Sequence, residues 1–126
     1  MTILVDTSVL IDHLRGIPAA RDALAGAAVS GRPLAGSVVT RVEVLAGMRP
    51  SEERPTRSLL DSLDWEPVGV EIADRAGELA NRYLRSHPGV DPVDYIIAAT
   101  AERLEAELWT RNVKHFPMLP GLRSPY

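Results

Sequence analysis

The sequence has no cysteine, and only one of its 14 basic residues is a lysine, the other thirteen being arginines. Without cysteine there can be no disulfides and no thiolate-bound metal, so a metal ion would have to be held by oxygen or imidazole groups. The formal net charge of −3 argues against a uniformly basic nucleic-acid binder. Arginine does suit two-pronged contacts with phosphate, although a GC-rich genome would produce the same bias.

Long hydrophobic runs are also missing. The longest, from Tyr95 to Ala101, is interrupted by Thr100 and is far too short to cross a bilayer. Asp6 breaks the apolar start of the chain and no basic residue precedes it, which is unlike a signal peptide. We therefore expect no membrane association and a cytoplasmic location. A chain of 126 residues is expected to form a single domain, residues 1–126, with one core.

Short apolar runs alternate with helical patterns along the chain. Strands are predicted at 2–5, 34–39, 65–70 and 107–110, and the tail at 116–122 has room for one more short edge strand. Pro67 favours an edge position for the third strand. Helices are predicted at 8–15, 19–28, from 40 to about 47–50, 51–63, 71–86 and 92–104. This order predicts a three-layer α/β/α fold with a mostly parallel central sheet of four to five strands.

Three acidic residues, Asp6, Glu43 and Asp94, each lie where a strand gives way to a helix or where a helix begins. In parallel sheets, ligands bind outside the carboxyl ends of the strands. If the three helices start at the same edge, their first turns face one crevice. Two carboxylates 4 Å apart repel by about 4 kcal/mol at an effective dielectric constant of about 20. A divalent ion would remove that cost, so we expect Mg²⁺ or Mn²⁺ at this edge.

Each acid also has a purely structural explanation. Thr40 and Glu43 have the spacing of a capping box, in which a hydroxyl and a carboxylate bind the free amides of a helix start. Asp91 and Asp94 form a near variant, with proline at the first helical position. Asp6 is placed to cap the helix that follows it. A non-catalytic α/β binding module whose acids are only helix caps is therefore the alternative hypothesis.

Other metal and phosphate chemistries fit the sequence less well. The three histidines lack the helical spacing of a zinc site, and no glycine-rich phosphate loop is present. A phosphoacceptor receiver domain has a similar length and also binds Mg²⁺, but it requires paired acids after the first strand, where Asp6 stands alone. The segment Val68 to Val70 also offers no acceptor aspartate.

Four segments, taken in order, resemble the PIN-domain ribonucleases, in particular the VapC-type toxins of bacterial toxin–antitoxin pairs. They are Leu4 to Leu10, Val42-Glu43, Asp94 with Ile97 to Ala101, and Thr110-Arg111-Asn112 followed by His115-Phe116. The resemblance implies an Mg²⁺- or Mn²⁺-dependent endoribonuclease that cleaves RNA with metal-activated water. It also implies a homodimer and a cognate VapB-type antitoxin. No motif indicates which RNA is cut.

Carried onto this chain, the resemblance makes Asp6, Glu43 and Asp94 the catalytic acids and metal ligands. Asn112 falls where family members often have a fourth acid, and its amide oxygen would bind a metal without supplying charge. Either a second metal site is weakened or Asp91 partly replaces that acid. Ser8 and Thr110 are further candidates, for contacts that support the metal ligands. Arg111 and Arg41 are candidates for contacts with RNA phosphate.

Overall fold

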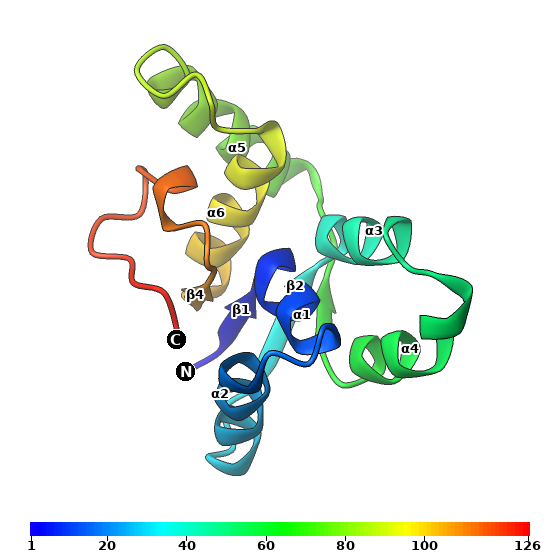
Figure 1. Cartoon of the computed structure of the whole chain (residues 1–126). Helices are drawn as coiled ribbons and strands as arrows, with labels where there is room; N and C mark the ends of the chain where they lie inside the picture. Colours follow the sequence, from blue (N-terminus) through cyan, green and yellow to red (C-terminus); the bar gives the residue numbers. More distant parts are fainter.

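A computed structural model describes all 126 residues and shows a four-stranded parallel sheet with helices on both faces (Figure 1). The strands are β1 (Ile3–Val5), β2 (Leu34–Ser37), β3 (Asp64–Glu66) and β4 (Glu107–Trp109), in the order β3-β2-β1-β4. The helices are α1 (Thr7–Leu14), α2 (Pro18–Val29), α3 (Val38–Ala46), α4 (Glu53–Asp61), α5 (Val70–Tyr83) and α6 (Pro92–Leu104). Two short 3₁₀ helices, η1 (Pro50–Glu52) and η2 (Val113–His115), complete the chain. The predicted fold class is confirmed, with four strands.

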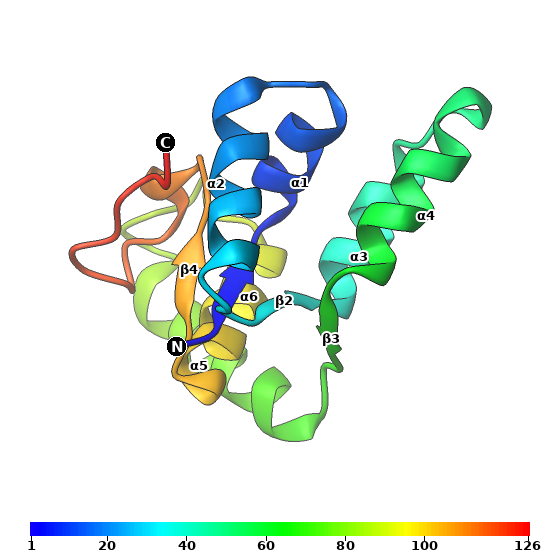
Figure 2. The ribbon, with the colours of Figure 1, turned by 90° about the horizontal axis from the view of Figure 1, so that it is seen from below.

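The central strand β1 is buried on both faces, which explains its uninterrupted apolar sequence. Ile3 and Val5 pack into a core formed with α1, α2, α3 and α4, whereas Leu4 points into the opposite core with α5 and α6. Figure 2 shows the two helical layers on either side of the sheet. None of the helices has the length and apolar character needed to span a bilayer.

Two predicted strand boundaries were wrong. The second strand ends at Ser37, and Val38 begins α3, because the Ser37 hydroxyl accepts the backbone N–H of Val39 at 3.3 Å and caps the helix. The third strand ends at Glu66, just before Pro67, and Val70 already begins α5. Its edge position is confirmed. The tail at 116–122 forms no strand.

Gly36 on β2 makes room for the side chain of the neighbouring edge strand. A Cβ at Gly36 would lie 2.5 Å from the ring atom Cζ3 of Trp65. The indole Nε1 donates to the backbone oxygen of Leu60 at 2.8 Å, and the guanidinium of Arg41 lies 5.1 Å from the ring centroid. Trp65 therefore ties β3 to α3 and α4.

Candidate active site

A polar cavity of about 440 Å³ opens beyond the carboxyl end of β1. Ile11 is its only hydrophobic lining residue. The lining comprises Asp6, Thr7, Ser8, Ile11, Asp12, Arg15, Glu43, Asp94, Arg111 and Asn112. The structure thus brings the three predicted acids together with Ser8, Arg111 and Asn112. Thr110 lies beneath Asp6, while Asp91 and Arg41 are not part of the lining.

Asp6 directly follows β1 and is locked to the neighbouring strand, since its backbone N–H donates to Trp109 at 2.9 Å. Its carboxylate Oδ2 accepts the Thr110 hydroxyl at 2.7 Å, and the same hydroxyl oxygen accepts the backbone N–H of Asn112 at 3.0 Å. Asp6 is only 6% exposed. Burial raises the pKa of Asp6, against the opposing effect of hydrogen bonds from Thr110 and the Thr7 backbone. The site therefore holds a carboxylate whose negative charge is poorly solvated.

Asp94 reaches the cavity from the first turn of α6, where it forms the predicted capping box with Asp91. Asp91 accepts the backbone N–H of Val93 at 2.9 Å, and Oδ2 of Asp94 accepts the backbone N–H of Asp91 at 3.2 Å. Burial raises the pKa of Asp94, and the charges of Asp6 and Asp91 raise it further. The cavity thus concentrates negative charge from two separate segments.

Glu43 lies in the middle of α3 and not in its first turn, so its predicted capping box with Thr40 was wrong. The cause is the earlier cap at Ser37, which moves the helix start upstream, and Thr40 itself is completely buried. The carboxylate of Glu43 accepts the Thr7 hydroxyl at 2.7 Å across two helices.

The helix-cap hypothesis explains only one of the three acids. Asp94 makes a capping hydrogen bond, whereas Asp6 occupies the position before α1 without one and Glu43 lies inside its helix. Helix capping therefore does not account for the presence of all three carboxylates in one cavity.

The donor atoms suit a hard divalent ion. Carboxylate, amide and hydroxyl oxygens line the cavity, and Mg²⁺ is commonly held by one or two carboxylates with several waters. The raised pKa values of Asp6 and Asp94 reflect charge that such an ion would neutralise. However, no group of three or more histidine, aspartate or glutamate side chains in the protein is arranged to hold a metal ion. The three acids share one cavity without closing around one point.

Several residues at this edge escaped the sequence prediction. The sequence pattern singled out Thr7 only as the neighbour of Asp6. Asp12 on α1 and Arg15 just after α1 face the same cavity because they lie about one helical turn apart. His115 places its Nδ1 3.3 Å from Oδ2 of Asp94. A contact of this kind depends on the path of η2, which no spacing rule predicts.

The C-terminal residue also returns to this region. The Tyr126 hydroxyl donates to Oδ2 of Asp12 at 2.8 Å. The guanidinium of Arg111 lies 4.8 Å from the Tyr126 ring centroid and 3.7 Å from the same Asp12 oxygen. Arg111 is therefore held beside the cavity, and the Ser8 hydroxyl accepts its backbone N–H at 3.0 Å.

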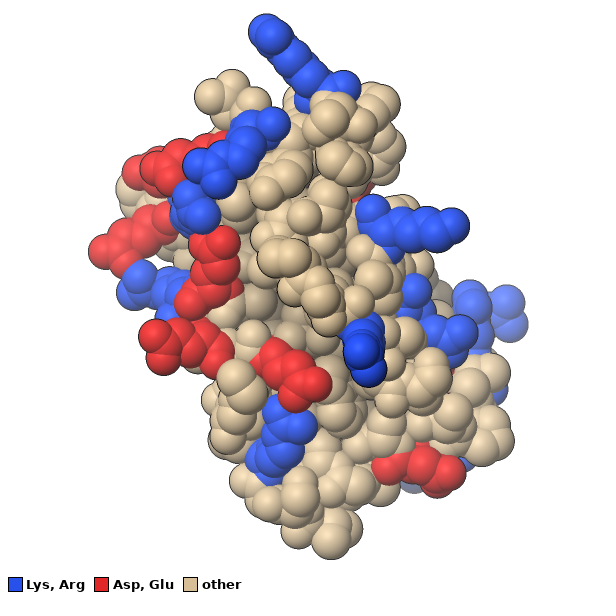
Figure 3. Space-filling view, turned by 90° about the vertical axis from the view of Figure 1, so that its left-hand side faces the viewer, with Lys and Arg blue, Asp and Glu red and all other residues tan.

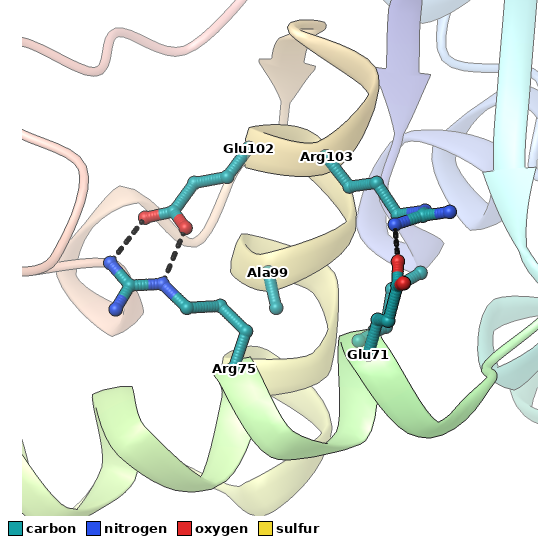
Figure 4. A pocket seen from close by; sticks show the side chains of 6 residues that line it. Glu71, Arg75, Ala99, Glu102 and Arg103 are labelled. Atoms are coloured by element: carbon teal, nitrogen blue, oxygen red, sulfur yellow. Dashed lines mark hydrogen bonds and ion pairs between the residues drawn. The ribbon is translucent and has the colours of Figure 1, made fainter.

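Some of the charges elsewhere form ion pairs. On the face shown in Figure 3, acidic and basic side chains lie next to one another along the left side, whereas mainly basic side chains lie on the right. A second cavity, between α5 and α6, is bordered by ion pairs of Arg75 with Glu102 and of Arg103 with Glu71 (Figure 4). Because these charges satisfy one another, the acidic cavity beyond β1 is the better candidate for a functional site.

Comparison with known proteins agrees with this choice. The family model described as PIN domain matches residues 3–117. The chain is 47% identical to ribonuclease VapC19 of Mycobacterium tuberculosis, with 98% of both chains covered. It is 49% identical to ribonuclease VapC10 of the same species, covering 98% of this chain and 92% of that protein.

Solved structures have the same architecture. A toxin–antitoxin complex from Klebsiella pneumoniae matches with a TM-score of 0.79 and 31% identity over 99% of this chain and 98% of that chain. VapBC from Salmonella typhimurium bound to DNA matches in fold with a TM-score of 0.80 and 21% identity, over 98% and 96% of the two chains. On the strength of the family match and these relatives, the chain belongs to the PIN-domain family.

Proposed function

We propose that the protein is a divalent-metal-dependent endoribonuclease, the toxin of a type II toxin–antitoxin pair, which hydrolyses RNA phosphodiester bonds. The two Mycobacterium tuberculosis relatives, at 47% and 49% identity, are named ribonucleases. The observation that carries the proposal is the meeting of Asp6, Glu43 and Asp94, from three separate segments, in one polar cavity.

In this proposal, Asp6 and Asp94 hold an Mg²⁺ or Mn²⁺ ion, and Glu43 and Asn112 complete the site. When bound, the ion supplies charge neutralisation at the phosphate and activation of the attacking water. Thr110 holds Oδ2 of Asp6 and Thr7 holds Oε1 of Glu43, so each hydroxyl limits the rotation of one carboxylate.

The two arginines in the lining differ in how they are held. Arg111 is fixed by Asp12 and Tyr126 and is placed to meet an RNA phosphate at the mouth of the cavity. Arg15 lines the same cavity without an ion-pair partner. Arginine suits contact with RNA phosphate at either position because its planar group contacts two phosphate oxygens at once.

The proposed partners are RNA, a VapB-type antitoxin and a second copy of the chain. The antitoxin proposal is supported by the Klebsiella pneumoniae neighbour, which is a toxin–antitoxin complex. A cavity of about 470 Å³ between α2 and α4, with Leu24, Leu34, Leu59 and Leu63 in its lining, offers an apolar surface for a partner segment.

A cleavage assay tests the enzyme proposal. Purified wild type should cut RNA with Mn²⁺ and lose this activity in EDTA, and Asp6→Asn and Asp94→Asn should cut at least 100-fold more slowly. Asp22→Asn is the matched control, since Asp22 is exposed on α2 and lies outside the cavity. Equal cleavage by wild type and Asp6→Asn would refute the proposal, as would no cleavage by wild type freed of its antitoxin.

The role of Asn112 has its own test. Asn112→Asp would add a carboxylate to the lining and should tighten Mn²⁺ binding in a calorimetric titration of the purified protein. Unchanged or weaker affinity would remove Asn112 from the proposed metal site, whatever the outcome of the cleavage assay.

A further inference from the structure

A smaller cavity of about 160 Å³ adjoins the acidic one and shares two lining residues with it, Ile11 and Arg15. It lies between α1, α3 and the segment η1–α4. Its apolar lining comes from Ile11, Leu14, Val44 and Met48. We call this cavity the side slot. Four of the nine residues in this lining are hydrophobic, and the others include Arg15, Arg49 and Glu52. A slot of this mixed character beside a strongly polar cavity suits a ligand with a charged group at one end and a flat ring with polar edges at the other.

Two arginines, Arg15 and Arg49, border the side slot. Neither forms an ion pair within the protein, in contrast to Arg111, which lies 3.7 Å from Asp12. Arg15 is also the residue that lines both cavities. Glu52 is the only acidic residue in the lining, so the two arginines leave the side slot with an excess of positive charge, which favours an anionic group of a ligand.

We propose that the side slot takes the base of the unpaired nucleotide next to the phosphate that is cut. This inference rests on the proposed ribonuclease function and adds a specificity site to it. Single-stranded RNA alternates phosphates with bases that can be turned outward, and a guanidinium can contact the phosphate or stack on the base. Arg15, facing both cavities, is placed for this dual contact. The slot is too small for a helix of a protein partner, whereas the cavity between α2 and α4 is larger.

Glu52 adds a chemical preference. Its Oε1 accepts the backbone N–H of Arg49 at 2.8 Å, and its second oxygen remains available at the slot. A carboxylate accepts a hydrogen bond from an exocyclic amino group. The side slot should therefore favour a base with an amino group, such as cytosine or adenine, over uracil.

The test uses a short single-stranded RNA with one mapped cleavage site. Each nucleotide in turn is replaced by an abasic one, and kcat/KM with Mn²⁺ is compared with that of the intact RNA. In wild type, one abasic position beside the cut should lower kcat/KM about tenfold, the scale of one stacked base. At that position, replacing cytosine by uracil should also lower kcat/KM.

Variants link this effect to the side slot. In Met48→Ala and Arg49→Gln, the ratio of kcat/KM for intact and abasic RNA should fall towards one. The control Arg54→Gln, an exposed arginine of α4 outside both cavities, should keep the wild-type ratio. The ratio is the informative quantity because a general loss of activity affects both RNAs equally.

Two results would overturn the inference. If wild type cuts every abasic RNA as well as the intact one, the side slot binds no base during cleavage. A side chain of a protein partner would then be the remaining candidate to fill it. If the ratio persists in both slot variants, the base binds elsewhere. Either result leaves the proposed ribonuclease function standing, whereas failure of wild type to cut any RNA would remove both.

Discussion

Replacing Thr110 by valine removes one hydroxyl from beneath the acidic cavity and preserves side-chain shape. Thr110 is fully buried, and its hydroxyl donates to Asp6 at 2.7 Å while accepting the backbone N–H of Asn112. Thr110→Val therefore leaves no cavity behind. Its effect reports the loss of the hydroxyl's hydrogen bonds, chiefly the one to the buried carboxylate of Asp6.

The expected loss follows from the charge of the acceptor. A hydrogen bond to a charged group contributes about 1.5–3 kcal/mol, so unfolding free energy should fall by about 2–3 kcal/mol. For 126 residues, an unfolding entropy of about 2.1 cal/mol/K per residue converts this loss into a fall of about 10 °C in Tm. Thr110→Ser, which keeps the hydroxyl and loses one methyl group, should cost only about 1 kcal/mol.

Urea unfolding at several pH values is the assay. The Thr110 hydrogen bond favours the charged form of Asp6, so its loss raises the pKa of Asp6 in the folded state. The extra cost of Thr110→Val is therefore largest when Asp6 is ionised, well above its folded pKa. It should shrink as the pH falls towards 3.8, the ordinary aspartate value. A loss below 1 kcal/mol at pH 8, or one that does not change with pH, would refute this reasoning.

Three further predictions concern the cavity and the sheet. Asp6→Asn should raise the Tm of the metal-free protein by a few degrees at pH 8. The reason is that a carboxylate whose pKa is raised in the folded state lowers stability above that pKa, so the gain in Tm should vanish as the pH approaches 3.8. Mn²⁺ should raise the Tm of wild type and not that of Asp6→Asn. Thr7→Val, which frees the carboxylate of Glu43, should lower kcat/KM about tenfold. The Tm should stay unchanged because one exposed hydrogen bond adds little stability, and Thr7→Ser should restore kcat/KM. Gly36→Ala should cost about 1–3 kcal/mol in a thermal melt, since its Cβ overlaps the Trp65 ring, and Trp65→Leu in the same chain should recover part of that loss.

The alternation of apolar runs with helical patterns was enough to predict the layered parallel sheet, because strand and helix periods are local properties. The capping box of Asp91 and Asp94 was equally accessible, since both partners lie within one turn of α6. The start of α3 could not be predicted in this way. Val38 and Val39 have strand-like side chains, but the Ser37 hydroxyl caps the helix two residues before Thr40. Local propensity is a weak preference that a cap and packing override.

The sequence by itself determined that Asp6 and Asp94 lie at the carboxyl edge, because Asp6 follows β1 and Asp94 lies in the first turn of α6, whereas Glu43 joins them from the middle of α3. How their oxygens are held was decided by contacts between distant segments. Thr110 reaches Asp6 across 104 positions, Thr7 reaches Glu43 across 36, and Tyr126 reaches Asp12 across 114. A hydrogen bond depends on ångström-scale distance and on angle, and only the packing of helices against the sheet sets these for residues so far apart in the chain.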